Sequence, residues 1–298
     1  MKILLTGATG FLGNNLLKKL TEIENITIIL LLRKTSNLDK IKKFNFKINK
    51  VYYNEEGIEK IFFENNIDVI IHTATTYGRF EDKESVFKSN LILPLKLICS
   101  ANKQVKKTIF INTDTFYGTN GYYNNFLNNY ISTKKMLKNL IMPFGNFPNV
   151  IFINLILEHL YGPNDRPEKF IPTIFKNCIN NKKEILLTKG EQLRNFIYVD
   201  DVVKAYEYII THLNSYEFTK YNEYSIGCNQ LYSIRTTVEL IHRITNSSSK
   251  LNFGAVQTQE GEIFTKSNPV NSLAHFGWRC DYSLEKGLKK ILSEQYGG

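Results

Sequence analysis

The chain has 298 residues, of which 43% are hydrophobic and 22% are charged, and this is ordinary globular usage. That length allows one large α/β domain or two modest ones, and it excludes a disulfide-stapled miniprotein, a disordered tail and a collagen-like fibre. The formal net charge of +10 favours a polyanionic partner, such as nucleic acid, a membrane surface or a phosphorylated substrate.

Short apolar segments alternate with amphipathic ones from the first residue. Residues 3–5 predict a strand, which is followed by a glycine-rich turn and by a helix with leucines 12, 16, 17 and 20 on one face. Residues 26–32 form a nearly continuous apolar run, typical of a strand buried on both faces of a parallel sheet. Further strands are predicted at 51–53, 69–72, 109–112 and 150–157, with helices at 58–63, 86–100 and 132–140. This β-α-β-α order predicts an α/β fold with a doubly wound parallel sheet.

After about residue 157 the pattern loosens. Three prolines, at 163, 167 and 172, interrupt a loop and a short helix. A strand at 196–199 is predicted to lead into a helix that starts at Asp200 or Asp201, whose side chains suit an N-cap. The last 70 or so residues mix a helix at 236–244 with glycine and asparagine turns. We therefore expect a smaller C-terminal region interleaved with the sheet rather than a second independent domain.

The four cysteines and the chain start bear on the cellular compartment. Cys99, Cys178, Cys228 and Cys280 stand far apart, with no C-x-x-C pair and no histidine at metal-ligand spacing, so no metal site is predicted. Four scattered thiols indicate a reducing environment. No stretch approaches the roughly 18 apolar residues of a membrane span, and Met1–Leu5 runs directly into the glycine turn, which leaves no room for a signal peptide. We expect a soluble, cytoplasmic protein with no membrane partner.

The segment Gly7-Ala8-Thr9-Gly10-Phe11-Leu12-Gly13 lies between the first predicted strand and helix. Glycine is needed where the backbone turns sharply and where a pyrophosphate approaches main-chain N–H groups, and the helix N-terminus adds partial positive charge. Glycines also make ordinary turns, so the triplet alone is a weak signal. Its position between strand and helix predicts a dinucleotide site formed by Gly7, Thr9, Gly10, Phe11, Leu12 and Gly13.

The end of the second strand indicates which dinucleotide is bound. A ribose with free hydroxyls is usually held there by a carboxylate, but this chain has Leu32-Arg33-Lys34-Thr35-Ser36. Arg33 could stack on adenine and pair with a 2′-phosphate, with Lys34 and Ser36 as further donors. The alternative is that both cations are simply solvated in a lysine-rich chain. We predict NADP(H) over NAD(H).

Tyr130 and Lys134 stand four residues apart, on one face of a predicted helix. A tyrosine works as an acid or base near neutrality only if its pKa falls well below its usual ~10, and a neighbouring ammonium favours the phenolate. Lys134 supplies that charge and could also bond the nicotinamide ribose. Tyr216/Lys220 and Tyr282/Lys286 share the spacing, but only Tyr130 follows a strand that ends in the polar cluster 112–115.

Together these features resemble the extended short-chain dehydrogenase/reductases, the NAD-dependent epimerase/dehydratase family. The resemblance covers nearly the whole chain and rests on the glycine turn, Asp68–Ala74, Asn90, Thr113, Tyr117-Gly118, Tyr130/Lys134, Tyr161–Pro163, Arg194–Asp201, Ile226-Gly227 and Gly277-Trp278. It implies a Rossmann-type fold in which Thr113 hydrogen-bonds the substrate oxygen, Tyr130 exchanges its proton and Lys134 tunes Tyr130. It also implies cofactor contacts at Ala74 and Lys134, and a homodimer through the helices that start near Val86 and Ser132.

Three branches of that family differ in the chemistry they need. A 4,6-dehydratase needs an acid pair after the active-site threonine, but Thr115 follows Asp114 here. A 4-epimerase retains NAD, which suits the acidic ribose clamp that this chain lacks. A reductase exchanges NADPH at every turnover, which suits Arg33. The reductase is therefore favoured.

Longer stretches are similar to one subfamily, the CDP-abequose and CDP-paratose synthases. They are residues 75–78, 110–116, 157–163, 169–172 and 190–194. The resemblance implies NADPH-dependent reduction of the 4-keto group of a CDP-3,6-dideoxyhexulose for bacterial O-antigen. It assigns the substrate to Thr75, Tyr77, Thr113, Tyr130, His159, Lys169, Phe170 and Arg194, with Arg194 at the diphosphate and Lys169 and Phe170 at the nucleotide. A core histidine near a bend remains the alternative for His159.

The resemblance divides the chain into an NADP-binding Rossmann domain, 1–157 with 194–227, and a nucleotide-sugar-binding region, 158–193 with 228–298. Two departures are visible: Asn54 stands near the place of a common adenine-capping aspartate, and 118–129 has no obvious sugar ligand. Other functions stay open, namely a dTDP- or GDP-4-keto-6-deoxyhexose reductase, a 4-epimerase and a non-catalytic NADPH-sensing regulator. A nucleic-acid partner is suggested by the charge alone, since no basic cluster with interleaved aromatics is present.

Overall fold

The computed structural model describes residues 1–42, 44, 48–52, 57–78, 82–115, 127–142, 147–213, 218–258, 262 and 271–297. The chain divides into two compact units, the first made of 1–156 and 203–224 and the second of 157–202 and 225–298. Residues 157, 194–202 and 225–227, which we expected with the sheet, belong to the second unit.

The first unit is built on a parallel sheet that is buried on both faces. In the described residues seven strands follow the order β11-β6-β5-β4-β1-β2-β3, and they are β1 (Lys2–Thr6), β2 (Thr27–Leu32), β3 (Ile48–Tyr52), β4 (Val69–His72), β5 (Thr108–Thr115), β6 (Val150–Leu157) and β11 (Tyr221–Ile226). The neighbours from β3 to β5 pair in parallel. The chain runs outward from β1 first in one direction and then in the other, so the carboxyl ends of β1 and β4 form the switch point where α/β sheets bind ligands. The predicted doubly wound, Rossmann-type sheet is confirmed.

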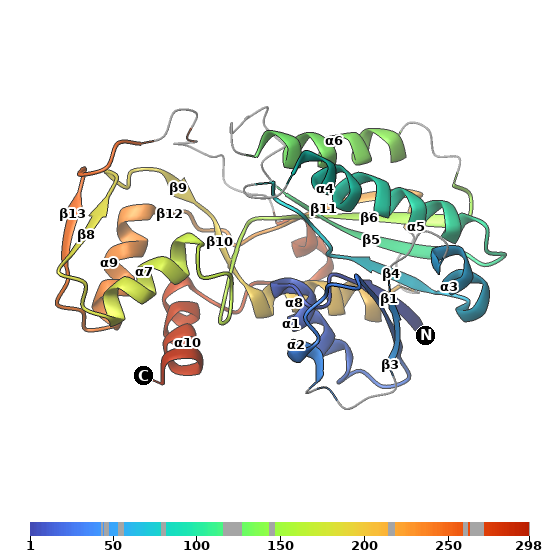
Figure 1. Cartoon of the computed structure of the whole chain (residues 1–298), viewed down its shortest axis with the longest axis horizontal. Helices are drawn as coiled ribbons and strands as arrows, with labels where there is room; N and C mark the ends of the chain where they lie inside the picture. The colour runs from blue at the N-terminus through green and yellow to red at the C-terminus, as the bar shows by residue number, and fades with distance from the viewer. Residues whose placement is uncertain are drawn as a thin grey trace. The chain divides into compact units, whose positions relative to one another are not determined.

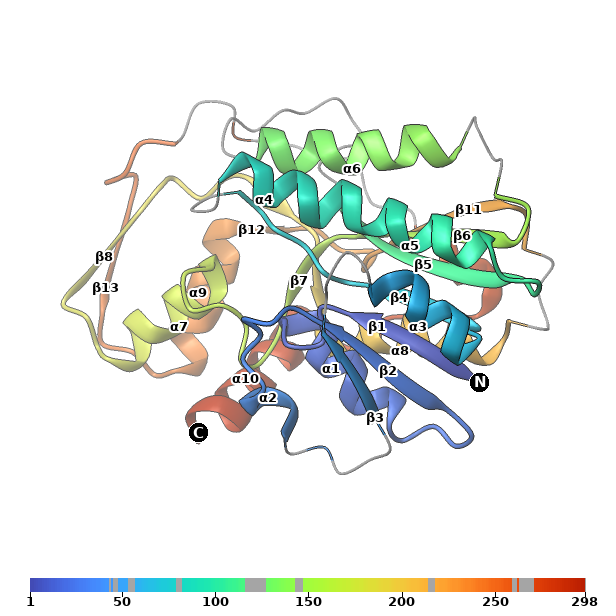
Figure 2. The ribbon, with the colours of Figure 1, turned by 45° about the vertical axis from the view of Figure 1, so that its right-hand side comes forward.

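Helices cover both faces of this sheet (Figure 1). On one face lie α3 (Gly57–Asn65), α4 (Lys83–Phe87), a π-helical turn η1 (Lys88–Ile92), α5 (Leu93–Asn102) and α6 (Asn128–Ile141), and on the other α1 (Phe11–Leu20) and the first-unit part of α8 (Val199–Thr211). Figure 2 shows the same two layers from another side, with the short α2 (Asp39–Lys42) beside α1. Leucines and isoleucines of α3, α5 and α6 pack on Leu4, Ile70 and Phe110 of the strands, and this cluster is the core of one face. An ion pair between Lys19 of α1 and Glu207 of α8 links the helices of the other face.

The second unit is made of short strand pairs and three longer helices. The strands pair as β7 (His159–Tyr161) with β10 (Phe196–Tyr198), β8 (Glu184–Leu187) with β13 (Lys250–Phe253), and β9 (Leu193–Arg194) with β12 (Tyr232–Ser233). The helices are α7 (Phe170–Ile179), α9 (Ile234–Ile244) and α10 (Leu284–Tyr296), with a 3-10 turn η3 (Ser272–Phe276). Ser233 and Ser283 cap α9 and α10 by accepting the backbone N–H three residues ahead. None of the described helices combines the length and apolar character needed to span a lipid bilayer.

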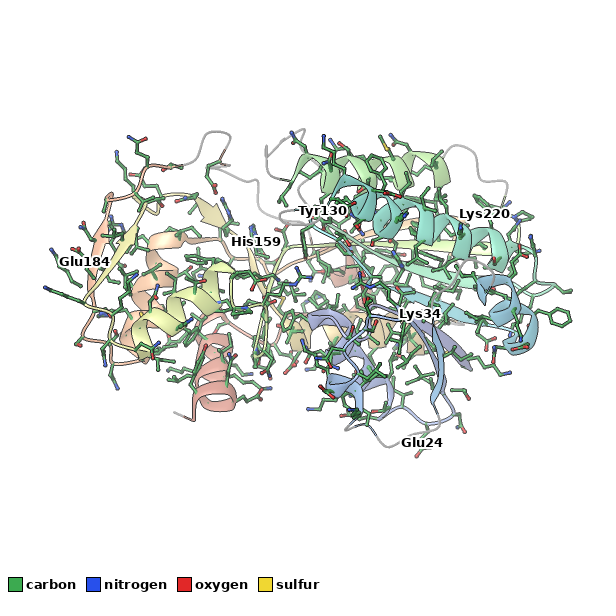
Figure 3. The ribbon with its side chains drawn as sticks, viewed as in Figure 1. Glu24, Lys34, Tyr130, His159, Glu184 and Lys220 are labelled. Carbon is green, nitrogen blue, oxygen red and sulfur yellow. A yellow bond between two sulfur atoms is a disulfide. The ribbon has the colours of Figure 1, made fainter. Side chains whose placement is uncertain are left out.

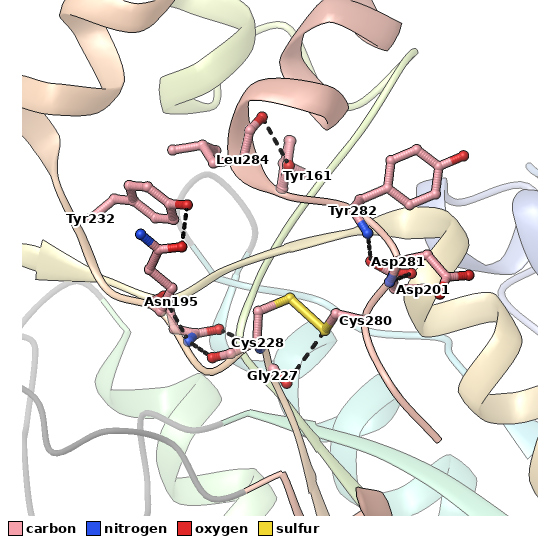
Figure 4. The surroundings of a disulfide bond; sticks show 11 residues. Tyr161, Asn195, Asp201, Gly227, Cys228, Tyr232, Cys280, Asp281, Tyr282 and Leu284 are labelled. Atoms are coloured by element: carbon pink, nitrogen blue, oxygen red, sulfur yellow. Dashed lines mark hydrogen bonds between the residues drawn. A yellow bond between two sulfur atoms is a disulfide. The ribbon is translucent and has the colours of Figure 1, made fainter. Parts of the chain in front are cut away.

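Two sequence expectations are corrected in the second unit. Helix α8 begins at Val199, so Asp200 and Asp201 lie in its first turn and not at the N-cap. Asp201 instead accepts the backbone N–H groups of Asp281 and Tyr282, at 2.9 and 3.2 Å. The four cysteines are not all free thiols, because Cys228 and Cys280 form a disulfide (Figure 4). Sequence spacing could not indicate this pair, since the two residues are 52 positions apart and are brought together only by folding.

Candidate functional site

The glycine turn joins β1 to α1 against the loop that follows β4. Gly7 has φ +73°, and a Cβ at this position would lie 2.7 Å from the backbone nitrogen of Ala74. A Cβ on Gly13 would lie 2.8 Å from Thr73 Oγ1, so both positions need glycine for close packing. Gly10 is the N-cap of α1, and among the described residues no side chain caps it. The first N–H groups of α1 are therefore available to an anion, and this cradle fits the pyrophosphate of a dinucleotide.

The predicted cofactor residues Thr9, Phe11 and Leu12 belong to this same turn and first helical residues. The loop after β4 is tied to β1 by Thr6, whose hydroxyl accepts from the Ala74 nitrogen at 3.3 Å and pairs with His72 Nδ1 at 2.9 Å. His72 is fully buried, and burial, with the neighbouring Lys134 charge, lowers the pKa of its imidazole to about 3. His72 is therefore a neutral support of the loop.

The predicted 2′-phosphate residues form an exposed turn directly after β2. Ser36 Oγ accepts from the Arg33 backbone nitrogen at 3.1 Å, and the Ser36 nitrogen donates back to the Arg33 carbonyl at 3.0 Å. The side chains of Arg33 and Lys34 are exposed. Because β1 and β2 are parallel neighbours, this turn lies at the same edge of the sheet as the glycine turn.

Loop 73–78 continues to Thr75 and Tyr77, both half-buried. Fully buried Asn90, in the π-helical turn, accepts from the Thr76 nitrogen at 2.9 Å and donates to the Thr76 carbonyl at 2.8 Å. The same amide donates to Thr133 Oγ1 on α6 at 3.2 Å. The ring of Tyr77 packs on that of Tyr130 with 5.0 Å between centroids. Asn90 thus holds the loop against the helix that carries the predicted acid.

Tyr130 and Lys134 lie in the first two turns of α6, with Tyr130 close to its N-terminal end (Figure 3). Tyr130 is 5% exposed and packs with Leu127 and Ile131. The Lys134 ammonium donates to the Thr113 carbonyl oxygen at 2.5 Å. Burial lowers the pKa of Lys134 below its ordinary value, and the charge of Asp114 acts in the opposite direction. The structure therefore brings three predicted catalytic residues, Thr113, Tyr130 and Lys134, to α6 and the end of β5.

The sequence does not single out Tyr206, which the structure places on Thr113. The Tyr206 phenol on α8 and Thr113 Oγ1 are 2.6 Å apart. Burial raises the pKa of Tyr206, so its phenol stays protonated. In a single sequence, an aromatic residue on the apolar face of a helix looks like any core residue. The contact of Tyr206 with Thr113 therefore could not be predicted from the sequence.

A partly buried polar network next to Thr113 was also missed. Asn154 of β6 donates to Asp114 at 2.9 Å and to Glu223 of β11 at 3.0 Å, and it accepts from Asn112 at 2.8 Å. Glu223 also pairs with Lys138 of α6 at 2.7 Å. Burial opposes the ionisation of Glu223, but its hydrogen bonds, that with Lys138 first among them, lower its pKa below the ordinary value. The network links three strands and α6 around Asp114.

The second unit holds the other predicted substrate residues. The His159 nitrogen donates to the Asn195 carbonyl at 3.0 Å, and its half-buried ring lies 5.8 Å from that of Phe196. Lys169 is the N-cap residue of α7, directly before Phe170.

Two of the predicted substrate residues, Lys169 and Arg194, already form ion pairs with acidic residues. Lys169 pairs with the buried carboxylate of Asp165 at 2.9 Å. Arg194 pairs with Glu262 and donates to the Leu193 carbonyl at 2.8 Å. Asp165 stands four residues before Lys169, whereas Glu262 is 68 residues from Arg194 and could not be paired with it from sequence spacing. Asn54 and Tyr117-Gly118, which we also considered, lie outside the described residues.

Comparison with known proteins adds a family to this geometry. The model of the NAD dependent epimerase/dehydratase family matches residues 3–227. CDP-abequose synthase of Salmonella muenchen is 37% identical over 296 residues, which are 98% of this chain and 97% of that protein. The enzyme of the same name from Salmonella typhimurium is 34% identical and covers 97% of each.

Solved structures agree on the fold. UDP-glucuronic acid 4-epimerase from Bacillus cereus, in complex with UDP-glucuronic acid and NAD, matches with a TM-score of 0.81 over 98% of both chains, at 21% identity. dTDP-glucose 4,6-dehydratase from Bacillus anthracis, in complex with NAD, matches with a TM-score of 0.75 at 22% identity, over 98% of this chain and 96% of that one.

Proposed function

This chain belongs to the NAD dependent epimerase/dehydratase family, and on that premise we propose that it reduces the 4-keto group of a nucleotide-linked deoxyhexulose with NADPH, as an abequose-synthase-like 4-ketoreductase. Similarity along the whole chain to CDP-abequose synthase supports this reading. The observation that carries it is the Tyr130/Lys134 pair on α6, with the buried Lys134 ammonium hydrogen-bonded to the carbonyl of Thr113. A phenol beside a buried cation is suited to give a proton to a carbonyl oxygen as that oxygen becomes an alcohol.

Thr113, Tyr130 and Lys134 have different roles in the proposed reduction. Tyr130 donates its proton to the 4-oxygen of the sugar, and Lys134 stabilises the phenolate that is left behind. Thr113 donates a hydrogen bond to the same oxygen as negative charge develops on it. The reduced nicotinamide supplies the hydride when it is bound. Lys134 also bonds the nicotinamide ribose.

The glycine turn binds the dinucleotide, and the exposed turn after β2 selects its phosphorylated form. Gly7, Gly10 and Gly13 let the pyrophosphate reach the backbone N–H groups at the start of α1, and Ala74 borders the site. Arg33 and Lys34 pair with the 2′-phosphate, which a carboxylate at the same place would repel. The family accommodates NAD(P), and we propose NADP(H).

The second unit is proposed to bind the nucleotide sugar. Arg194 is assigned to the diphosphate, Lys169 and Phe170 to the nucleotide, and His159 to the sugar. Thr75 and Tyr77 are proposed as substrate contacts from the family resemblance alone. The nucleotide is CDP by similarity, and the product is a dideoxysugar such as CDP-abequose or CDP-paratose for O-antigen.

We propose the cytoplasm as the location of the reaction, as expected from the sequence. A homodimer through the helices that start near Val86, in α4, and near Ser132, in α6, is proposed from the family resemblance.

A substrate panel tests the proposal. NADPH oxidation is followed with CDP-, dTDP- and GDP-4-keto sugars, and the configuration at the product's 4-carbon is determined by NMR. We expect turnover with at least the CDP-linked sugar. Net NADPH oxidation separates a reductase from an epimerase, which shows none, and flat traces across the panel from a folded protein would refute the reductase.

A further inference from the structure

Tyr206 contacts the catalytic threonine directly. The phenolic oxygen of Tyr206 and Thr113 Oγ1 are 2.6 Å apart, and Tyr206 is 0% exposed. Each oxygen carries one hydrogen, and only one of the two hydrogens can lie between them. The direction of this hydrogen bond decides whether the Thr113 hydroxyl is left to donate or to accept.

Burial decides the direction. Within the described ranges, Thr113 is the one hydrogen-bond partner of the Tyr206 oxygen. If Thr113 donated, the O–H of Tyr206 would be buried without an acceptor, which is the costly arrangement for a polar hydrogen. If Tyr206 donates, its hydrogen is satisfied, and half-exposed Thr113 keeps its own hydrogen for a ligand. The raised pKa of Tyr206 keeps that hydrogen in place at all physiological pH values.

We propose that Tyr206 is a positioning residue that donates to Thr113 Oγ1 and thereby fixes Thr113 as a hydrogen-bond donor to the substrate. This inference rests on the proposed 4-keto reduction. A keto oxygen can only accept, so a threonine held as a donor fits it. The bond strengthens as the oxygen gains charge on reduction, and the effect is therefore expected on kcat rather than on KM.

The kinetic test uses Tyr206→Phe, which removes one oxygen and keeps the ring. We expect kcat to fall about fivefold to tenfold, since Thr113 then rotates freely, with KM changed less than twofold. Thr113→Val is expected to cost about a hundredfold. Adding Tyr206→Phe to Thr113→Val should cost nothing further, because Tyr206 acts only through Thr113. Additive losses would overturn the proposal.

Tyr161→Phe is the matched control. Its phenol is also buried and donates to a backbone carbonyl, that of Leu284, at 3.4 Å. Removing this oxygen should leave kcat within twofold of the wild type, and thermal unfolding of all variants shows whether folding is retained. An equal fall in kcat in Tyr161→Phe would overturn the proposal.

Neutron diffraction of the deuterated protein without substrate gives a readout that does not depend on turnover. We expect a deuteron bonded to the Tyr206 oxygen and directed at Thr113 Oγ1. A deuteron bonded to Thr113 and directed at Tyr206 would refute the inference. A wild-type protein inactive on the whole panel but with the deuteron on Tyr206 would refute the proposed function, and with it the role of the hydrogen bond in this reduction.

Discussion

The Lys134 ammonium donates a 2.5 Å hydrogen bond to the backbone carbonyl oxygen of Thr113, and this bond ties α6 to the end of β5. Lys134 is 3% exposed, so its charge is held next to Tyr130 in a poorly hydrated position. Thr113 in turn contacts Tyr206. The positions of the Thr113 hydroxyl, which we propose is catalytic, and of the Lys134 charge are thus set by the same stretch of β5.

The first prediction concerns alkaline pH. Burial lowers the pKa of Lys134 from its ordinary 10.5, and the Asp114 charge only partly opposes this. In the proposed mechanism the protonated lysine stabilises the phenolate, so kcat should fall as the pH rises through the lowered pKa. Lys134→Arg should have a lower kcat, but its kcat should begin to fall only at a higher pH than in the wild type, since a guanidinium stays charged. If kcat fell over the same alkaline pH range in both proteins, a group other than Lys134 would be responsible for the fall.

Tyr130→Phe should remove activity and leave the cofactor site intact. Losing the acid is expected to lower kcat by about a thousandfold. NADPH affinity, measured by fluorescence titration, should change less than twofold, because the ring of Tyr130 still packs on Tyr77 and Leu127. Tyr77→Phe is the control at the same ring contact and should retain the acid step. Weakened NADPH binding in Tyr130→Phe would mean that the phenol supports the fold of the site.

Strand positions were predictable because the sheet is buried on both faces. Residues 69–72 and 150–157 were predicted with the bounds of β4 and β6, since both are nearly continuous apolar runs, interrupted only by His72 and Asn154. Strand β11 was missed because its sequence, YNEYSI, is mostly polar and half-buried. Its Glu223 is acceptable there only because Lys138, Asn154 and Tyr221 satisfy it. Such a partner set exists only after folding, so a pattern of apolar residues cannot predict it.

The residues of the candidate site also divide into those that could be predicted from the sequence and those that could not. The glycine turn and the Tyr130/Lys134 pair were predictable because each depends on residues close in sequence. Tyr206 on Thr113, and Glu262 on Arg194, join positions 93 and 68 residues apart. The sequence around these residues does not indicate either contact.

Arg33→Ala should shift the cofactor preference. Arg33 is exposed in the turn after β2, where its loss would remove a charge-assisted hydrogen bond to a 2′-phosphate. KM for NADPH should rise about tenfold to a hundredfold, with KM for NADH within twofold. Lys60→Ala, another exposed cation at 70% side-chain exposure on α3, is the control and should leave both unchanged. An unaltered NADPH/NADH ratio in Arg33→Ala would rule out the assignment.

His72 should make the protein acid-sensitive. Its folded pKa of about 3 lies below the ordinary 6.5, so between these values the unfolded chain binds a proton that the folded chain does not. Its contribution to stability is therefore complete above pH 6.5 and is lost as the pH falls toward 3, by at most about 1.4 kcal/mol per pH unit. Urea unfolding of His72→Gln should show a shallower fall over this window. An unchanged slope would mean that other groups cause the acid sensitivity.

The Cys228–Cys280 disulfide should stabilise the second unit in oxidising buffer. It closes a loop between residues 52 positions apart, and a crosslink of this kind contributes about 2–4 kcal/mol, mainly by restricting the unfolded chain. When it is reduced, Asn195 still bonds the Cys228 nitrogen at 3.0 Å and Asp201 still bonds the segment after Cys280, so the fold should persist (Figure 4). Dithiothreitol should therefore lower the unfolding free energy of the wild type but not that of Cys228→Ser. The control is Cys99→Ser, which changes an exposed free thiol and should respond to dithiothreitol like the wild type. Equal sensitivity of Cys228→Ser and the wild type to the reductant would contradict a stabilising role.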